Sequence, residues 1–239
     1  AVRAADVAVS RRGALAHPTP PGDGAAAEGV ILGAANQPGE DTRTGARGAV
    51  QLARLPGTVR GGTVNRLCGS GLNAVGLAAQ AIRAGEAELM IAGGAESMTR
   101  APYVMGKAAT AFDRAQTIED TTMGWRFINP ALRAAYGVDT MPQTAENVAE
   151  QWAITREAQD AFALDSQTKA AAALASGRFD AEITPVSVPQ RRGDPVVCAV
   201  DEHPRATSLD ALAKLKPVVR PEGTVTAGNA SGLNDACVL

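Results

Sequence analysis

Short apolar runs alternate with amphipathic stretches along the N-terminal part of the chain. Apolar runs of about four to eight residues bounded by glycine or polar residues are typical of buried strands, and apolar positions spaced three and four apart are typical of helices. We therefore predict strands over 30–35, 61–67 and 88–94, and helices over 43–54 and over 72–84, the latter ended by Gly85. Because strands and helices follow one another in turn, this part of the chain is predicted to have α/β organisation.

The pattern changes after Met98, where prolines recur and the alternation of strands and helices stops. We predict a helix that begins after Pro142 with Thr144 as its N-cap, a helix over 155–176 before Gly177, a short helix over 209–215, and one or two strands within 186–200 around a turn at 191–194. The second half of the chain is therefore predicted to form a different unit.

Both ends of the chain are predicted to be cut. Residues 4–15 carry a weak helical pattern, which the proline-rich tract 17–24 breaks and turns into a loop. The chain begins without Met and without a signal-peptide pattern, and it ends at Leu239 inside an apolar stretch. We expect a longer natural sequence.

Composition narrows the class of protein. Of the 239 residues, 45% are hydrophobic, and 23 basic against 25 acidic residues leave a net charge of −2. The ordinary apolar fraction excludes disorder, and the near-neutral charge offers no electrostatic basis for binding nucleic acid. No run approaches the length of about 20 apolar residues that a membrane-spanning helix needs. We expect one or two globular domains, with neither nucleic acid nor membrane among the partners.

The cysteines indicate the redox environment. Cys68, Cys198 and Cys237 are odd in number and form no CxxC pair. This usage argues for a reducing compartment and against a secreted disulfide scaffold, so we expect a cytoplasmic protein.

Cys68 is the strongest candidate for chemistry. It follows a predicted strand, lies in a Gly-Ser-Gly turn and opens an uncharged helix. Unpaired N–H groups and the helix dipole at such a position stabilise a thiolate, and the small neighbours let a substrate carbonyl approach the backbone, so that an amide N–H can serve an oxyanion. The sequence pattern alone is also compatible with a buried core cysteine beside a turn, since buried free cysteines are common, and both interpretations stay open at this point.

The other reactive residue types carry weaker signals. Cys198 lies in a strand-like apolar run, which predicts a core thiol, and Cys237 lies too near the end of the chain to be assigned. The histidines, His17 and His203, are not placed near Cys68 by the sequence, so no Cys-His pair is predicted. No spacing of His, Cys or carboxylates suggests a metal site.

Two glycine pairs and one polar segment call for an interpretation. The pairs at 61–62 and 93–94 do not fit the spacing of a dinucleotide-binding or P-loop motif, and close packing of buried strands explains them better. Residues 224–232 are rich in small polar side chains. They either wall a narrow slot or form an ordinary loop, and the sequence does not decide between the two.

Three long motifs follow one another along the chain: NRLCGSG at 65–71, AGGAESM at 92–98 and GTVTAGNASGLND at 223–235. In sequence and in order they resemble the signatures of the thiolase family. The similarity runs from about Val30 to the end of the chain, whereas residues 1–29 match poorly. The chain is identified on these motifs as a member of that family.

Two further stretches narrow the resemblance. GEDTR at 39–43 and IEDTTMGWRFINP at 118–130 are similar to the 3-oxoadipyl-CoA (β-ketoadipyl-CoA) thiolases of aromatic-compound breakdown. The resemblance implies cleavage of 3-oxoadipyl-CoA to succinyl-CoA and acetyl-CoA. A thiolase of acetoacetyl-CoA or of fatty 3-ketoacyl-CoA is the alternative enzyme.

The resemblance also implies a fold and its division. We expect the thiolase fold, a layered α/β/α/β/α arrangement, of which this chain holds the N-terminal half and an inserted loop domain while the C-terminal half is absent. Residues 1–99 are expected to form the N-terminal domain with an incomplete start, 100–231 a loop domain that binds CoA, and 232–239 a truncated return to the N-terminal domain.

The chemistry implied by the family is ping-pong acyl transfer through an acyl-cysteine. Cys68 matches the nucleophile, and coenzyme A is a substrate, so that no bound cofactor and no metal are expected. The family commonly forms dimers or tetramers. By the same matching, four residues fall where the family contacts CoA: Met141, Arg205, Ala227 and Ser231.

This sequence stops before three further motif residues of the family: a His in a Gly-His-Pro motif, an Asn, and a second Cys in a Cys-x-Gly-x-Gly motif. The pair His17-Pro18 echoes the first of these, but it lies upstream of Cys68 and is not assigned to it. We therefore expect the chain alone to be a poor enzyme and to expose an apolar face. The alternative is a non-enzymatic function, in which the chain is an inactive subunit that binds CoA.

Overall fold

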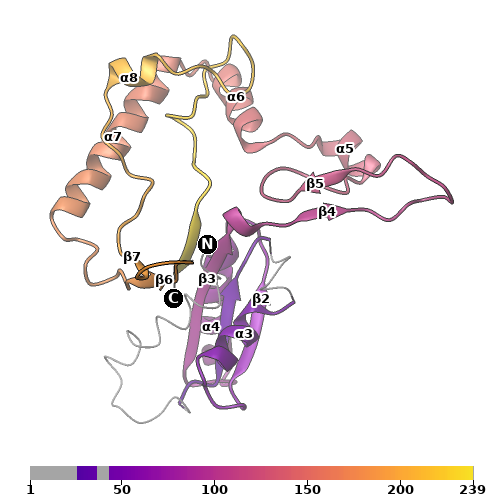
Figure 1. The fold of residues 1–239 in the computed structure, drawn as a ribbon, viewed down its shortest axis with the longest axis vertical. Helices are drawn as coiled ribbons and strands as arrows, with labels where there is room; N and C mark the ends of the chain where they lie inside the picture. The colour runs from indigo at the N-terminus through magenta and orange to yellow at the C-terminus, as the bar shows by residue number, and fades with distance from the viewer. Residues whose placement is uncertain (1–25, 37–42, 239) are drawn as a thin grey trace. The chain divides into compact units, whose positions relative to one another are not determined.

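The computed structural model describes residues 26–36 and 43–238. The predicted helix at 4–15, the loop at 17–24 with His17, and most of the motif at 39–43 lie outside the described residues. The chain divides into two compact units: the first holds the described residues up to Tyr103, 184–199 and the residues from Asn234 on, and the second holds 104–183 and 200–233 (Figure 1).

The first unit is built on a four-stranded sheet. Its strands are β1 (Gly29–Gly33), β2 (Arg60–Val64), β3 (Met90–Ser97) and β8 (Asp235–Val238), in the order β2-β1-β3-β8. β1 is parallel to β2 and β3, whereas β8 is antiparallel to β3. The three strands that were predicted here are confirmed with shifted ends, and the apolar end of the chain forms the fourth.

Helices α3 (Gly45–Leu52) and α4 (Ser70–Arg83) connect the parallel strands. Val30 and Leu32 of β1 pack into a buried cluster with α3, while the alternating position Gly33 meets the start of α4. Because successive side chains of a strand point to opposite faces, the two helices lie on opposite faces of the sheet. Gly85 has a φ of +73°, as expected for the glycine that ends α4.

Close packing explains the glycines of the strands. A Cβ atom added at Gly61 would lie 2.6 Å from the Cα of Arg47 in α3, and one at Gly94 would lie 3.4 Å from the Cα of Gly71 in α4. The helices therefore approach the sheet at positions where a side chain would be in the way. The close-packing interpretation of the glycine pairs is confirmed at these two positions, whereas Gly62 has nothing within 4 Å of its added Cβ.

The outer face of α4 exposes large apolar side chains. Leu72 is 79% exposed and Val75 is 50% exposed, although both belong to a helix whose other side packs on the sheet. This agrees with the expectation of an exposed apolar face.

An antiparallel pair of strands, β6 (Val186–Val188) and β7 (Val196–Cys198), belongs to the first unit. Its turn contains Gly193 at a φ of +83°, so the predicted turn at 191–194 is confirmed. The prediction of a core thiol at Cys198 is wrong, because all three residues of β7 are exposed. An apolar strand is buried only where another layer covers it, and nothing covers β7 in the described chain.

The second unit contains α6 (Met141–Gln151), α7 (Arg156–Ala175) and α8 (Leu209–Ala213). The prediction for α7 is confirmed at both ends. The hydroxyl of Thr155 accepts the N–H of Ala158 as an N-cap, and Gly177 follows the helix with a φ of +69°.

The predicted start of α6 is wrong by one turn. The N-cap is Thr140, whose hydroxyl accepts the N–H of Gln143 while the Gln143 side chain accepts the N–H of Thr140. Thr144 lies inside the helix. Pro142 misled the prediction, because proline is tolerated in the first turn of a helix, where its missing N–H has no partner to lose.

Several short elements between the units' main helices and strands were not predicted. β4 (Tyr103–Met105) pairs with β5 (Ile118–Asp120), and a 3-10 turn, η1 (Met98–Arg100), follows β3. Helix α5 (Pro130–Tyr136) is capped by Asn129, whose side chain accepts two backbone N–H groups. Elements of this length carry too few residues to show a period.

The division into units differs from the predicted one at one segment. The predicted limits at 99 and 231 lie close to the observed limits at 103 and 233, but 184–199 belongs to the first unit.

Within the described chain, no helix is long and apolar enough to cross a membrane. Whether the second unit binds CoA stays a prediction.

Candidate functional site

Cys68 lies directly before the N-cap residue of α4. The N-cap is Gly69, no side chain caps this end of the helix, and its first turn contains no acidic residue. The thiol is exposed. The N–H groups of Gly69 and Ser70 donate to the carbonyls of Arg66 and Leu67, and the dipole of α4 gives this end of the helix a positive potential. The structure therefore contradicts the interpretation of Cys68 as a buried core cysteine, and its role as a nucleophile stays a prediction.

The last residue of β1, Gly33, packs directly against the first turn of α4. A Cβ atom added at Gly33 would lie 2.2 Å from the carbonyl carbon of Ser70, in the first turn of α4. Ser70 itself is 3% exposed. The backbone of the sheet and the backbone of the helix therefore meet without a side chain between them, which gives the cysteine turn a rigid base.

The remaining cysteines lie on two other strands of the first unit, and the described histidine belongs to the second unit. Cys198 is exposed on β7, and Cys237 is partly buried on β8, where it pairs in register with Ala95 of β3. His203 belongs to the second unit. In the described parts of the chain, no group of three or more His, Cys, Asp or Glu side chains could hold a metal ion.

All four residues predicted to contact CoA belong to the second unit and, like Cys68, are exposed. Two of them meet: the guanidinium Nη2 of Arg205 donates to the carbonyl oxygen of Ala227 at 3.5 Å. The backbone N–H of Arg205 donates to Gln167 of α7 at 3.0 Å. Among the described residues, no hydrogen bond joins Met141 or Ser231 to this pair.

Residues 224–232 form a loop that is held by a buried carboxylate. Glu146 of α6 is 2% exposed and accepts the N–H groups of Thr224 and Val225 at 2.7 and 2.8 Å. Burial raises the pKa of this carboxyl, but the hydrogen bonds from Val225 and Thr224, together with the charge of Arg220, bring the pKa below its ordinary value. The carboxylate is therefore ionised at neutral pH and fastens the loop to α6.

A second buried carboxylate holds the other end of the same loop. Asp160 of α7 is 4% exposed, accepts the Arg156 Nε at 2.8 Å, and accepts the Asn229 side chain at 3.0 Å. Asn229 in turn accepts the N–H of Thr226 at 2.7 Å. Residues 224–232 are therefore a loop that is tied at Thr224–Val225 and at Asn229, and whether this loop walls a slot stays a prediction.

The sequence analysis did not single out Glu146 or Asp160. Both lie on helices that also carry carboxylates on their exposed faces. The sequence therefore does not show that these two acidic side chains, and not the others, are buried. Their partners follow 78 and 69 positions later. The run of small polar residues at 224–229 was the one sequence signal for these hydrogen bonds, and it did not indicate which carboxylates they bind.

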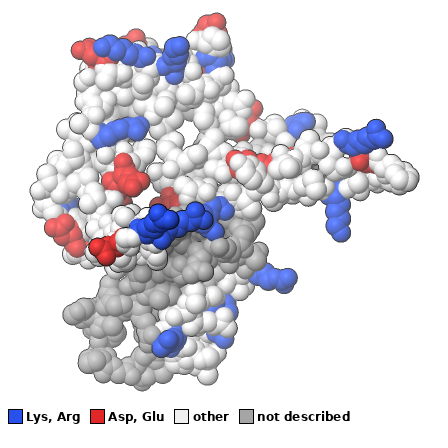
Figure 2. Space-filling view, in the orientation of Figure 1, with Lys and Arg blue, Asp and Glu red and all other residues white. Residues whose placement is uncertain are grey.

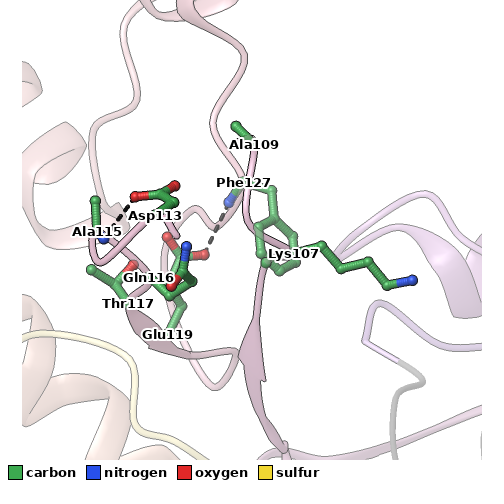
Figure 3. A pocket seen from close by; sticks show the side chains of 9 residues that line it. Lys107, Ala109, Asp113, Ala115, Gln116, Thr117, Glu119 and Phe127 are labelled. Atoms are coloured by element: carbon green, nitrogen blue, oxygen red, sulfur yellow. Dashed lines mark hydrogen bonds between the residues drawn. The ribbon is translucent and has the colours of Figure 1, made fainter. Parts of the chain in front are cut away.

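A small cavity lies in the second unit, apart from every predicted site residue. It has a volume of about 170 Å³ and is lined by residues between Gly106 and Phe127, among them Lys107 and Glu119 (Figure 3). The Phe127 N–H donates to the Glu119 carboxylate at 3.0 Å and closes one wall. None of the residues proposed to act on a substrate lines it.

Charged side chains of both signs are spread over the face shown in Figure 2. Lys and Arg side chains and Asp and Glu side chains both occur over the described surface that is in view (Figure 2). This distribution accords with the small net charge of −2.

Comparison with known proteins gives a consistent family. The profile described as "Thiolase, N-terminal domain" matches residues 21–239. A beta-ketoadipyl-CoA thiolase of Acinetobacter baylyi is 63% identical over 98% of this chain and 59% of its own length. A 3-oxoadipyl-CoA/3-oxo-5,6-dehydrosuberyl-CoA thiolase of Escherichia coli is 53% identical over 98% of this chain and 59% of its own.

A solved structure agrees with these relatives. The acetyl-CoA acetyltransferase of Bacillus anthracis superposes with a TM-score of 0.84 at 37% identity, covering 98% of this chain and 58% of that one. The chain therefore spans about three fifths of the length of the relatives that it matches.

Proposed function

The chain belongs to the thiolase family, and on that premise we propose that it acts as an acyl-CoA:acetyl-CoA C-acyltransferase, with Cys68 as the nucleophile. The observation that carries the proposal is the exposed thiol placed directly before the uncapped N-terminus of α4. The thiolate is the reactive form of cysteine, and an exposed cysteine at the positive end of a helix dipole is accessible to an acyl-CoA.

The reaction proceeds in two acyl transfers. The Cys68 thiolate attacks the 3-keto carbon of a 3-oxoacyl-CoA, the C2–C3 bond breaks, and the departing carbanion takes up a proton to become acetyl-CoA. The thiol of free CoA, having given up its proton, then attacks the acyl-cysteine, and the thiolate of Cys68 leaves. Splitting one carbon–carbon cleavage into two thioester exchanges suits a nucleophile that is also a good leaving group.

The substrate we propose is 3-oxoadipyl-CoA, which yields succinyl-CoA and acetyl-CoA. Support comes from two relatives, a beta-ketoadipyl-CoA thiolase and a 3-oxoadipyl-CoA/3-oxo-5,6-dehydrosuberyl-CoA thiolase, which are 63% and 53% identical to this chain. Acetoacetyl-CoA is the second candidate, because the solved structure that resembles the chain is an acetyl-CoA acetyltransferase. Rates of CoA-dependent cleavage of 3-oxoadipyl-CoA, acetoacetyl-CoA and a medium-chain 3-oxoacyl-CoA distinguish the candidates, and a preference for acetoacetyl-CoA contradicts the aromatic-pathway assignment.

For CoA itself we propose contacts with Met141, Arg205, Ala227 and Ser231. Their exposure supports this, and the Arg205 guanidinium supplies a cation for the phosphates of the nucleotide. A homo-oligomer in the cytoplasm completes the proposal. The exposed thiols of Cys68 and Cys198 accord with a reducing compartment.

The nucleophile is tested by trapping the acyl-cysteine. Incubation with succinyl-CoA transfers the succinyl group to the Cys68 sulfur and releases CoA, so intact mass and peptide mapping are expected to show one succinyl adduct on Cys68. The adduct is expected to be absent from Cys68→Ser and retained in Cys198→Ser, which is matched in chemistry and also exposed.

Two outcomes contradict the proposal. Equal labelling of Cys68→Ser and the unaltered chain shows that another residue takes the acyl group. If the unaltered chain binds CoA but forms no adduct with succinyl-CoA, the chain is an inactive CoA-binding subunit.

A further inference from the structure

The residue before Cys68 has an unfavourable backbone conformation. Leu67 has a φ of +49°, in the left-handed region that side chains with a Cβ rarely adopt. Its side chain is 69% exposed, so packing does not hold the residue in place. Hydrogen bonds of the turn must therefore maintain this conformation, and with it the direction in which the chain presents Cys68.

Backbone bonds from the Gly69 N–H to the Arg66 carbonyl and from the Ser70 N–H to the Leu67 carbonyl, both 3.0 Å, belong to this turn, and two side chains add to them. The Oδ1 of Asn65 accepts the N–H of Leu67 at 2.9 Å, which is the arrangement of an Asx turn. The hydroxyl of Ser70 accepts the N–H of Arg66 at 2.8 Å and donates to the carbonyl of Leu67 at 2.6 Å. The N–H and the carbonyl of Leu67 are thus both hydrogen-bonded by side chains.

Asn65 differs from Ser70 in what else it binds. Its Nδ2 donates to the carbonyl oxygen of Ala35, in the segment after β1, at 2.9 Å. The N–H of Ala35 donates to the Glu96 carboxylate of β3 at 2.6 Å. One side chain therefore joins the Leu67 turn to a segment that is itself fastened to the neighbouring strand.

We propose that Asn65 is a positioning residue for the nucleophile: by bridging the Leu67 N–H and the Ala35 carbonyl, it keeps Leu67 left-handed and the Cys68 sulfur at the start of α4. This inference rests on the thiolase function proposed above. When the amide is removed, Leu67 relaxes toward negative φ and the sulfur moves away from the helix amides. Cys68 then reacts more slowly with an electrophile at neutral pH.

The experiment measures alkylation of Cys68 by iodoacetamide, with Cys198 of the same chain as the internal reference. Peptide mass spectrometry gives both rates, at about pH 7 and at about pH 10, where ordinary thiols are ionised. In Asn65→Ala the ratio of the Cys68 rate to the Cys198 rate is expected to fall about two- to fivefold at pH 7 and to recover at pH 10. A general loss of structure would give the same recovery, so the circular dichroism spectrum of Asn65→Ala must match that of the unaltered chain.

Asn73→Ala is the matched control. Asn73 lies in the same helix that Cys68 precedes, and its side chain makes no hydrogen bond to any described residue. Its ratio is expected to equal that of the unaltered chain at both pH values. A second variant, Asn65→Ser, retains a weaker acceptor for the Leu67 N–H but is too short to reach Ala35, so an intermediate ratio is expected.

The outcomes separate this inference from the proposed function. If Cys68 of the unaltered chain reacts no faster than Cys198 at pH 7, the proposed nucleophile is wrong. If Cys68 reacts faster and its ratio is unchanged in Asn65→Ala, the positioning role is wrong while the nucleophile stands. Should Asn65→Ala not fold, Asn65→Ser decides, and an undiminished ratio there overturns the role of Asn65.

Discussion

At the scale of single residues, Gly33 carries the clearest steric requirement near the site. Its added Cβ would lie 2.2 Å from the carbonyl carbon of Ser70, which is backbone and cannot turn aside. We predict that Gly33→Ala lowers the stability of the first unit by about 3 kcal/mol, because β1 and α4 must separate. Hydrogen exchange of the β1 and α4 amides measures this loss. The control is Gly62→Ala in β2, where the added Cβ meets nothing within 4 Å and exchange should change little; equal protection in the two variants contradicts the steric argument.

At the scale of elements, the N-terminus of α6 distinguishes two threonines. Thr140 caps the helix in a capping box, whereas Thr144 lies within it and donates its hydroxyl to the Thr140 carbonyl at 3.1 Å. Thr140→Ala is expected to lower the free energy of unfolding by about 1 kcal/mol, because N–H groups of the first turn lose their acceptor. Thr144→Ala is expected to change it by less than about 0.5 kcal/mol. Urea unfolding followed by the fluorescence of Trp152, which directly follows α6, measures both changes. A larger loss of stability in Thr144→Ala than in Thr140→Ala would show that Thr144 is the N-cap, as the sequence predicted.

At the scale of the whole molecule, the buried carboxylate of Glu146 gives the second unit a pH dependence of its own. Hydrogen bonds to Glu146 hold its pKa below the ordinary value despite the opposing effect of burial. The stabilisation is therefore present above the pKa of the unfolded chain, about 4.3, and is lost as the pH falls through the lower pKa of the folded state. Glu146→Gln is expected to cost about 1 kcal/mol at pH 7, and the difference from the unaltered chain is expected to shrink toward pH 3.

Tryptophan fluorescence is suited to this measurement, because both tryptophans, Trp125 and Trp152, belong to the second unit. The control is Glu150→Gln on the same helix, where the carboxylate is 68% exposed and pairs with Arg220 at 3.0 Å. An exposed pair of this kind contributes little, so less than about 0.5 kcal/mol is expected. A pH-independent difference between Glu146→Gln and the unaltered chain would show that the Glu146 charge does not stabilise this unit.

Much of the fold follows from local pattern. The strands of the first unit, α4 and its terminal Gly85, and α7 with its Thr155 cap were predictable because their signals lie within one element: apolar period, cap residue and terminating glycine. The start of α6 was misplaced because Pro142 is compatible with either side of a helix boundary. Cys198 was misassigned because an apolar strand does not reveal whether a second layer covers it.

The sequence by itself determined that an apolar strand leads into a small-residue turn and a helix, and so that Cys68 lies at a helix N-terminus. These relations involve neighbours in the chain, whose geometry is set by local sterics and hydrogen bonding. Tertiary structure alone decided that Asn65 reaches Ala35, 30 positions away, and that Glu146 binds Val225, 79 positions away. A hydrogen bond between distant residues leaves no period and no spacing in the sequence, because it depends on how the intervening chain packs.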